Sequence, residues 1–142
     1  MTKKGPIIII DDDEEDQLLC KTALENLIHP DQIRTFTNGS DAFKYLLDTK
    51  ENPYLILCDL QMPKMDGLEL RVQINNNDKL RKKTIPFIFI SGSAHKEDLT
   101  EAYELGVHGF FTKPNSLDGW KDCIEKILQY WNACLEPGDL IL

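Results

Sequence analysis

The sequence predicts a doubly wound α/β fold, in which one parallel sheet carries helices on both faces. Short apolar runs rich in β-branched residues are typical of strands that are covered on both sides. These runs alternate with amphipathic helical patterns, which favours parallel strands joined by right-handed crossovers. A length of 142 residues fits a single domain, and 42% hydrophobic residues suffice for a core without metal or disulfide support.

The strands of this sheet are expected at five places along the chain. The first, third and fourth runs are almost wholly apolar, whereas the second is weaker and should be more exposed. In chain order the expected strands are Ile7–Ile10, Gln32–Thr37, Tyr54–Cys58, Ile85–Ile90 and His108–Thr112.

Five helices are expected to follow these strands. The last is the clearest, because its apolar residues recur at the spacing of one helix face and Ser116 can cap its first turn. The expected helices are Glu14–Ile28, Ser40–Leu47, Gly67–Asn75, Glu97–Leu105 and Ser116–Trp131.

The formal charge of −8 at pH 7 argues against nucleic acid as a partner. No apolar stretch reaches the ~18 residues of a membrane-spanning helix, and no secretory signal is recognisable, so we expect no membrane association and a cytoplasmic protein. The cysteines lack the C-x-x-C spacing of zinc or redox sites and are expected to be buried apolar residues. They are Cys20, Cys58, Cys123 and Cys134.

Polar side chains follow several of the predicted strands at their carboxyl ends, where doubly wound sheets bind ligands. The first strand leads into an acidic run, residues 11–16, and the third is followed by Asp59. Ser91 follows the fourth strand and Lys113 the fifth. Carboxylates, a hydroxyl and an ammonium group should therefore meet at one edge of the sheet.

The acidic run divides into two parts. Residues 13–16 are explained by the N-terminus of a helix, where negative charges meet the positive end of the helix dipole. Asp11 and Asp12 directly follow a buried strand, and their mutual repulsion would be costly without a cation nearby. Clustered carboxylate oxygens suit a hard divalent ion, so we expect the acidic cluster to bind Mg²⁺.

Asp59 and Lys113 each allow two interpretations. Asp59 either ends a strand in a turn or is a nucleophilic carboxylate of the kind that forms an aspartyl phosphate. Lys113 either lies on the surface or brings its charge beside the carboxylates, where it could hold a bound phosphoryl group.

Together these residues resemble those of the receiver domain of two-component response regulators. The resemblance rests on Asp11–Asp12, the run Cys58–Gly67 with its D-x-x-M-P-x-M-D-G pattern, Ser91–Gly92 and Lys113–Pro114. It covers nearly the whole chain. It implies a flavodoxin-like (CheY-like) sheet with the strand order 2-1-3-4-5.

The resemblance implies that Asp59 accepts a phosphoryl group from the phosphohistidine of a sensor histidine kinase or a phosphotransfer protein. Asp12 and Asp59 would ligate Mg²⁺ directly, Asp11 mainly through water, and the backbone carbonyl of Gln61 would complete the protein ligands. The chain would then be a phosphoacceptor in signal transduction rather than an enzyme, assisting only its own phosphorylation and dephosphorylation.

The resemblance also implies roles for residues around the phosphate. Ser91 would hydrogen-bond one phosphoryl oxygen, and Lys113 would pair with another. The Lys113–Pro114 peptide bond would be cis, which would aim the lysine inward.

Switching and dephosphorylation are assigned by the same resemblance. Phe110 would move with Ser91 and change the face formed by the fourth helix, fifth strand and fifth helix; the alternative is an ordinary core residue. Gln61 and Ser93 occupy positions that tune hydrolysis of the aspartyl phosphate.

The predicted receiver covers residues 1–135, and residues 136–142 form a C-terminal tail. A stand-alone receiver would signal by docking or dimerisation, or would pass phosphate on as a shuttle.

The polar stretch Asn75–Thr84 is expected to be a solvated connection, or a contact for an acidic partner through its basic half. This stretch, Tyr130–Trp131 and the apolar Leu140–Leu142 resemble small receivers that serve bacterial phytochrome kinases. That likeness implies a homodimer through the fourth helix, fifth strand and fifth helix.

Three other functions compete with this interpretation. A haloacid-dehalogenase-type phosphatase also uses a strand-end aspartate, Mg²⁺ and a lysine, but Gln61 stands where its general acid would be. A flavodoxin-like electron carrier would need a phosphate loop rich in Ser, Thr and Gly after the first strand, and none is present there. The third alternative is an interaction module that never accepts phosphate, although the side chains that phosphorylation requires are all present.

Overall fold

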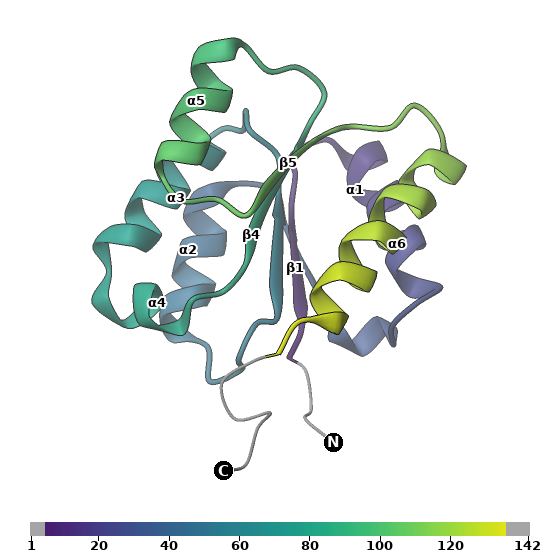
Figure 1. Cartoon of the computed structure of the whole chain (residues 1–142). Helices are drawn as coiled ribbons and strands as arrows, with labels where there is room; N and C mark the ends of the chain where they lie inside the picture. The colour runs from purple at the N-terminus through teal and green to yellow at the C-terminus, as the bar shows by residue number, and fades with distance from the viewer. Residues whose placement is uncertain (1–4, 136–142) are drawn as a thin grey trace.

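The computed structural model describes residues 5–135, which form a central sheet flanked by helices (Figure 1). The strands are β1 (Ile7–Ile10), β2 (Ile33–Phe36), β3 (Leu55–Cys58), β4 (Phe87–Ser91) and β5 (Gly109–Thr112). The helices are α1 (Glu14–Glu25), α2 (Gly39–Asp48), α3 (Gly67–Asn76), α4 (Asp78–Lys83), α5 (Lys96–Glu104) and α6 (Leu117–Ala133), with a short 3₁₀ helix, η1 (Pro30–Gln32).

The sheet has the strand order β2-β1-β3-β4-β5, and every neighbouring pair is parallel, as predicted. Ile10 at the end of β1 pairs with Phe36 of β2 and Cys58 of β3, while Ser91 of β4 pairs with Thr112 of β5. The chain adds β2 on one side of β1 and the later strands on the other side. The direction of strand addition therefore reverses at β1, where a ligand site is expected.

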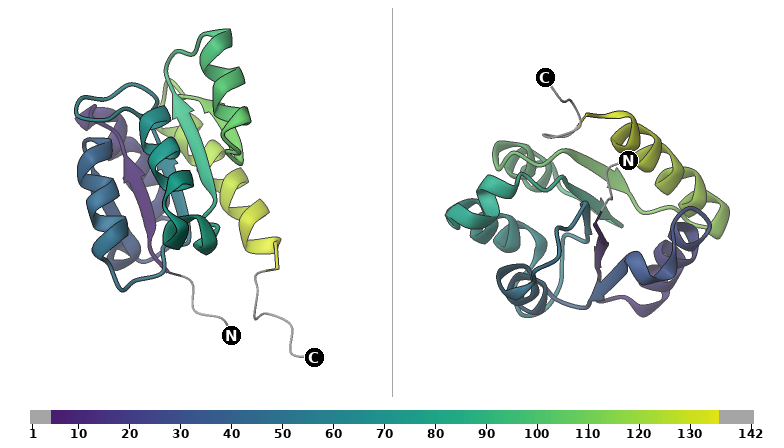
Figure 2. Two further views of the ribbon diagram at one scale, coloured as in Figure 1. Left: turned by 90° about the vertical axis from the view of Figure 1, so that its left-hand side faces the viewer. Right: turned by 90° about the horizontal axis from the view of Figure 1, so that it is seen from below.

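Alternation along the strands divides the core into two layers. Ile7 and Ile9 pack with apolar residues of α1 and α6, whereas Ile8 and Ile10 pack with those of α2, α3, α4 and α5. Figure 2 shows the two groups of helices on opposite faces of the sheet. Because β1, β3 and β4 are covered on both sides, burial explains why these strands are apolar up to Ser91 at the end of β4.

The structure differs from the sequence prediction in the stretch before β4. Asn75–Thr84 is not a plain solvated connection, because it contains α4 as a sixth α-helix within the described residues. Asn77 caps this helix by accepting a hydrogen bond from the N–H of Leu80 at 3.0 Å. Leu80 is fully buried, so one apolar side chain anchors an otherwise polar segment to the core.

The structure also bears on the predictions for the cysteines and for membrane-spanning helices. Cys20, Cys58 and Cys123 are buried and unpaired as expected, whereas Cys134 at the end of α6 is partly exposed. Within residues 5–135, no helix combines the length and apolar character needed to cross a membrane. The tail, residues 136–142, lies outside the described residues.

Gly67 allows α3 to start directly against the segment that follows β3. A Cβ atom on Gly67 would lie 2.4 Å from the carbonyl oxygen of Asp59 and 2.5 Å from Cε1 of Phe89. The N–H of Gly67 donates to the carbonyl of Leu60 at 2.8 Å, and Asp66 caps the helix. The absence of a side chain at residue 67 therefore helps to fix the position of Asp59.

Replacement of Gly67 by alanine should destabilise the fold by about 1–3 kcal/mol, because either the Asp59 backbone or the Phe89 ring must move. Gly92→Ala is the matched control, since its Cβ would make only an ordinary contact, 3.7 Å from Cδ of Lys113. Its stability should change by no more than about 0.5 kcal/mol. Urea unfolding followed by circular dichroism measures both, and equal losses would contradict the proposed crowding at residue 67.

Candidate functional site

The predicted site residues converge at the carboxyl edge of the sheet. Asp11 follows β1, Asp59 follows β3, Ser91 ends β4 and Lys113 follows β5. Backbone hydrogen bonds continue the strand pairing beyond the ends of the strands. The N–H of Asp59 donates to the carbonyl of Ile10 at 2.8 Å, and the N–H of Lys113 donates to the carbonyl of Ser91 at 2.9 Å. Residues far apart in sequence are thus fixed side by side by the sheet itself.

Asp11, Asp12 and Asp59 form a compact cluster of carboxylates. One oxygen atom from each lies within 4.8 Å of the others. Asp11 and Asp59 are only 5% and 8% exposed, whereas Asp12 is open to solvent. Anionic oxygens that are partly accessible to water match the preference of Mg²⁺ for one or two carboxylates together with several waters. The donor set therefore fits a hard divalent cation.

The ammonium group of Lys113 lies among these carboxylates. Its Nζ atom is 2.9 Å from Asp16 Oδ2, 3.0 Å from Asp11 Oδ2 and 3.2 Å from Asp59 Oδ2. The lysine side chain is 12% exposed and its stem passes beside Gly92. Of the two interpretations of Lys113, the structure therefore excludes a lysine that extends into solvent.

Charge and burial oppose each other in this cluster. Burial raises the pKa of Asp11 to about 6, and the nearby Asp59 carboxylate adds to this effect against the hydrogen bonds from Asp13 and Lys113. Burial alone would lower the pKa of Lys113, but its hydrogen bonds to Asp16 and Asp11 raise it overall. Lys113 is therefore a fixed positive charge at neutral pH.

Main-chain amides orient the two buried carboxylates. The N–H of Asp13 donates to Asp11 Oδ1 at 2.9 Å, and the N–H of Leu60 donates to Asp59 Oδ1 at 2.8 Å. In each aspartate, the other oxygen faces Lys113. Both carboxylates are consequently held in place before any ligand arrives.

The expected cis form of the Lys113–Pro114 bond is wrong, because the described chain contains no cis peptide bond. Lys113 points inward nonetheless, since it leaves β5 at the edge beside the cluster and its flexible four-carbon stem reaches the carboxylates. The two forms of an X–Pro bond differ by only about 0.5–1 kcal/mol, so the sequence alone did not determine which form is present.

The other predicted residues differ in burial and in their contacts. Ser91 is buried, and its hydroxyl donates to the carbonyl of Ser93 at 2.9 Å. Gln61 and Ser93 are exposed loop residues. Phe110 is half-buried, with its ring centroid 5.5 Å from that of Phe89, so it does pack against the core. The movement of Phe110 on phosphorylation remains a prediction.

Asp16 is a site residue that the sequence analysis missed. The sequence analysis attributed the charge of Asp16 to the dipole of the following helix, α1. In the structure, however, the Asp16 carboxylate makes the shortest of the three contacts with Lys113. The available signal was its position about one helical turn after the residues that leave β1, which can return a side chain to the edge of the sheet.

Comparison with known proteins places this geometry in a family. Residues 7–125 match the family model described as "Response regulator receiver domain". The chain belongs to the response regulator receiver family. This membership confirms the resemblance inferred from the four strand-end motifs, and such domains are signalling modules that work with histidine kinases or phosphotransfer proteins.

Two curated proteins are similar to this chain over most of their length. The chain is 31% identical over 129 residues to the probable methanogenesis regulatory protein FilR2 of Methanothrix harundinacea, covering 88% of this chain and 82% of that protein. It is 28% identical over 130 residues to the response regulator Rcp1 of Synechocystis sp., covering 88% of this chain and 87% of Rcp1.

Solved receiver structures agree with the fold of this one. The phosphorylated cyanobacterial phytochrome response regulator RcpA has a TM-score of 0.83 at 28% identity, with 94% of this chain and 98% of RcpA covered. The Mn²⁺-bound form of Rcp1 has a TM-score of 0.78 at 26% identity, with 93% and 97% covered. The predicted likeness to phytochrome response regulators is thereby confirmed. Receiver domains bind a divalent metal in an acidic pocket, which corresponds here to the cluster of Asp11, Asp12 and Asp59.

Loss of the buried ammonium group of Lys113 should destabilise the receiver. Lys113→Met would leave the Asp11 and Asp59 carboxylates without their shared partner, at a cost of about 2–4 kcal/mol at neutral pH. Lys126→Met is the matched control, because both side chains of the Lys126–Asp122 pair are about two-thirds exposed and solvent screens their attraction, so this substitution should change the stability little. Urea unfolding in metal-free buffer tests this, and similar effects of the two substitutions would contradict the importance assigned to the buried ammonium.

Proposed function

We propose that this receiver accepts a phosphoryl group on Asp59 from the phosphohistidine of a sensor histidine kinase or a phosphotransfer protein. The observation that carries the proposal is the placement of a buried carboxylate beside two further carboxylates and 3.2 Å from a lysine ammonium. A carboxylate is a suitable nucleophile for forming an acyl phosphate. The acidic surroundings and the fixed cation suit a reaction in which anionic oxygens must approach each other.

The transfer requires little covalent chemistry from the protein. An oxygen of Asp59 would form a bond to phosphorus while the P–N bond of the phosphohistidine breaks, and the electron pair of that bond remains on the imidazole. Lys113 would donate a hydrogen bond to a phosphoryl oxygen, and the hydroxyl of Ser91 would turn from Ser93 to another. Such groups act by positioning and by stabilising charge.

The carboxylate cluster around Asp59 would hold Mg²⁺. Asp12 and Asp59 are proposed as direct ligands, with Asp11 acting mainly through water and the backbone carbonyl of Gln61 completing the protein contribution. The bound ion would neutralise charge on the carboxylates and the phosphoryl oxygens during in-line transfer. The carboxylates of Asp11 and Asp59 keep their orientation through the amides of Asp13 and Leu60.

Signal output is proposed to follow from the charge that phosphorylation adds, roughly −1.5 to −2. Ser91 and Phe110 would shift towards the phosphate and alter the surface formed by α5, β5 and α6. Phe110 would act by packing, because its ring adjoins Phe89 and carries no hydroxyl. Gln61 and Ser93 are exposed and would tune the hydrolysis of the aspartyl phosphate.

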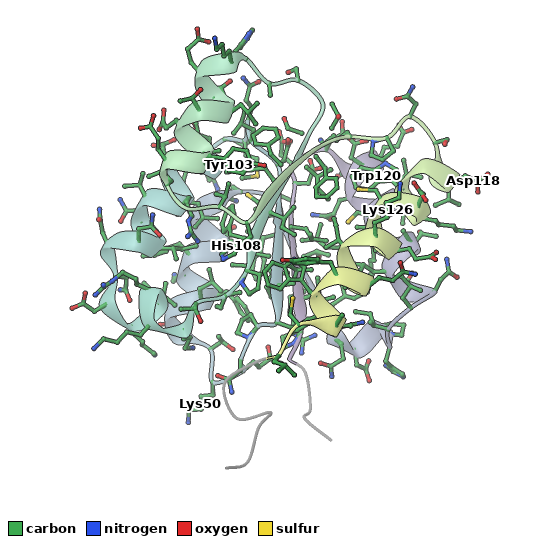
Figure 3. The ribbon with its side chains drawn as sticks, in the orientation of Figure 1. Lys50, Tyr103, His108, Asp118, Trp120 and Lys126 are labelled. Carbon is green, nitrogen blue, oxygen red and sulfur yellow. The ribbon has the colours of Figure 1, made fainter. Side chains whose placement is uncertain are left out.

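The α5–β5–α6 surface is also the proposed site of homodimerisation. It contains a cavity of about 350 Å³, lined in part by Tyr103, Phe110, Phe111, Tyr130 and Trp131. Figure 3 shows Tyr103 on α5 and Lys126 on α6 on either side of β5. Aromatic side chains of this kind are enriched in protein interfaces.

We propose a receiver unit of residues 1–135 that acts in the cytoplasm without being an enzyme for other substrates.

Incubation of the chain with acetyl phosphate and Mg²⁺ should add one phosphate-sized mass, measured on the intact protein. Asp59→Asn should abolish the gain, because the amide is not a nucleophile for phosphorus, and removal of Mg²⁺ by a chelator should nearly abolish it. Phosphomonoesters should not be turned over, since Gln61 cannot act as a general acid. The absence of a mass gain that depends on Asp59 would favour the unphosphorylated interaction module, and rapid ester hydrolysis would favour the phosphatase.

Homodimerisation should be stronger after phosphorylation and should depend on Tyr130, which is 63% exposed beside the cavity. Tyr130→Glu should weaken self-association at least about tenfold, because a charge would have to be buried in an aromatic interface. Leu18→Glu is a control for an equally exposed apolar residue, on α1. Sedimentation velocity measures both variants. A monomeric phosphoprotein, or equal effects of the two substitutions, would contradict this interface.

A further inference from the structure

Asp16 holds Lys113 from outside the metal cluster. Its Oδ2 atom lies 2.9 Å from Lys113 Nζ, and its side chain is 27% exposed. The carboxylates close enough to share a metal ion are those of Asp11, Asp12 and Asp59, and Asp16 is not among them. Lys113 thus contacts two carboxylates that belong to the cluster and one that does not.

The first turn of α1 is fixed by hydrogen bonds that keep Asp16 in place. The side chain of Asp13 caps the helix by accepting from the N–H of Asp16 at 3.0 Å. The amide of Gln17 donates to the carbonyls of Asp11 and Phe36, at 3.1 and 3.0 Å, and so ties α1 to the ends of β1 and β2. The Asp16 carboxylate is therefore presented to Lys113 by a segment that is anchored on both sides.

We propose that Asp16 is a positioning residue that keeps Lys113 beside Asp59 while a divalent cation occupies the carboxylate cluster. This inference rests on the Mg²⁺ site of the proposed function and assigns a role to a residue outside it. Asp16 would act through Lys113 and would not itself bind the metal.

The reason lies in competition between two cations for the same oxygens. Lys113 shares Asp11 and Asp59 with the proposed metal site, and like charges in a poorly solvated place repel each other strongly. Asp16 offers Lys113 a charge-assisted hydrogen bond that metal binding does not remove. The lysine can then give up contacts with the cluster and remain near it, available for a phosphoryl oxygen on Asp59.

Without the Asp16 charge, Lys113 would depend on Asp11 and Asp59 alone. Metal binding would then have to displace a buried ammonium that has no other anionic partner among the described residues. Two effects follow: weaker metal binding, and a less well positioned lysine once metal is bound. The first can be measured without any phosphotransfer.

The test is a set of Mg²⁺ titrations followed by the NMR signals of backbone amides. Asp16→Asn should lower the affinity for Mg²⁺ by about fivefold to tenfold, as expected for losing one charge-assisted hydrogen bond. Glu15→Gln removes the same charge from the neighbouring, exposed position on α1 and should change the affinity by less than about twofold, because exposed charges are screened. Asp16→Glu, which keeps the charge, should recover part of the affinity.

The decisive comparison repeats these substitutions in a Lys113→Met background. If Asp16 acts by holding Lys113, Asp16→Asn should there have no larger effect than Glu15→Gln. An undiminished effect of Asp16→Asn would overturn the inference, since Asp16 would then act on the metal directly. Equal effects of Asp16→Asn and Glu15→Gln with Lys113 present would also overturn it.

Failure of the proposed function gives a different result. A wild-type chain that binds no Mg²⁺ would contradict the metal site itself, before any question about Asp16 arises. Thermal unfolding of each variant in the absence of metal shows whether it is folded, and the Asp16→Glu variant keeps the test informative if Asp16→Asn is unstable.

Discussion

The structure depends on the close packing of carboxylates around a cation at the carboxyl edge of the sheet. Asp11 and Asp59 are almost fully buried, and each turns one oxygen towards Lys113. Buried carboxylates this close repel each other unless a positive charge is shared between them. Lys113 supplies that charge here, and in the proposed function a divalent metal would share the same oxygens. The balance of charge at this edge is therefore set by Lys113 and the carboxylates that surround it.

The sheet makes this arrangement possible. Residues from the ends of β1, β3, β4 and β5 come together because parallel strands all finish at one edge, and backbone hydrogen bonds extend the pairing as far as Asp59 and Lys113. Below that edge, β1, β3 and the first four residues of β4 are apolar and buried, so the base of the site is packed from both faces of the sheet. The small residue Gly67 allows the next helix to approach Asp59 closely. Function thus rests on a precise register that hydrophobic packing maintains.

Much of this arrangement could be predicted from the sequence. The apolar runs and amphipathic patterns gave the sheet and five of the helices, and the strand-end motifs gave the residues that converge. α4 was missed because its sequence is polar apart from the buried Leu80, so periodicity had almost nothing to detect. The contact of Asp16 with Lys113 was missed because the two residues are distant in sequence and the charge of Asp16 already had a local explanation. The form of the Lys113–Pro114 bond was wrongly inferred from resemblance, since a small energy difference decides it.

Oxygens that follow separate strands are proposed to surround one cation site, with Lys113 at its side. Diffraction data collected on crystals soaked in Mn²⁺, at a wavelength where manganese scatters anomalously, test this most directly. We expect one strong anomalous peak within bonding distance of the carboxylates of Asp12 and Asp59 and close to Asp11, with Lys113 still in contact with Asp16. An anomalous map without a peak among these carboxylates, or with manganese bound only elsewhere, would contradict it.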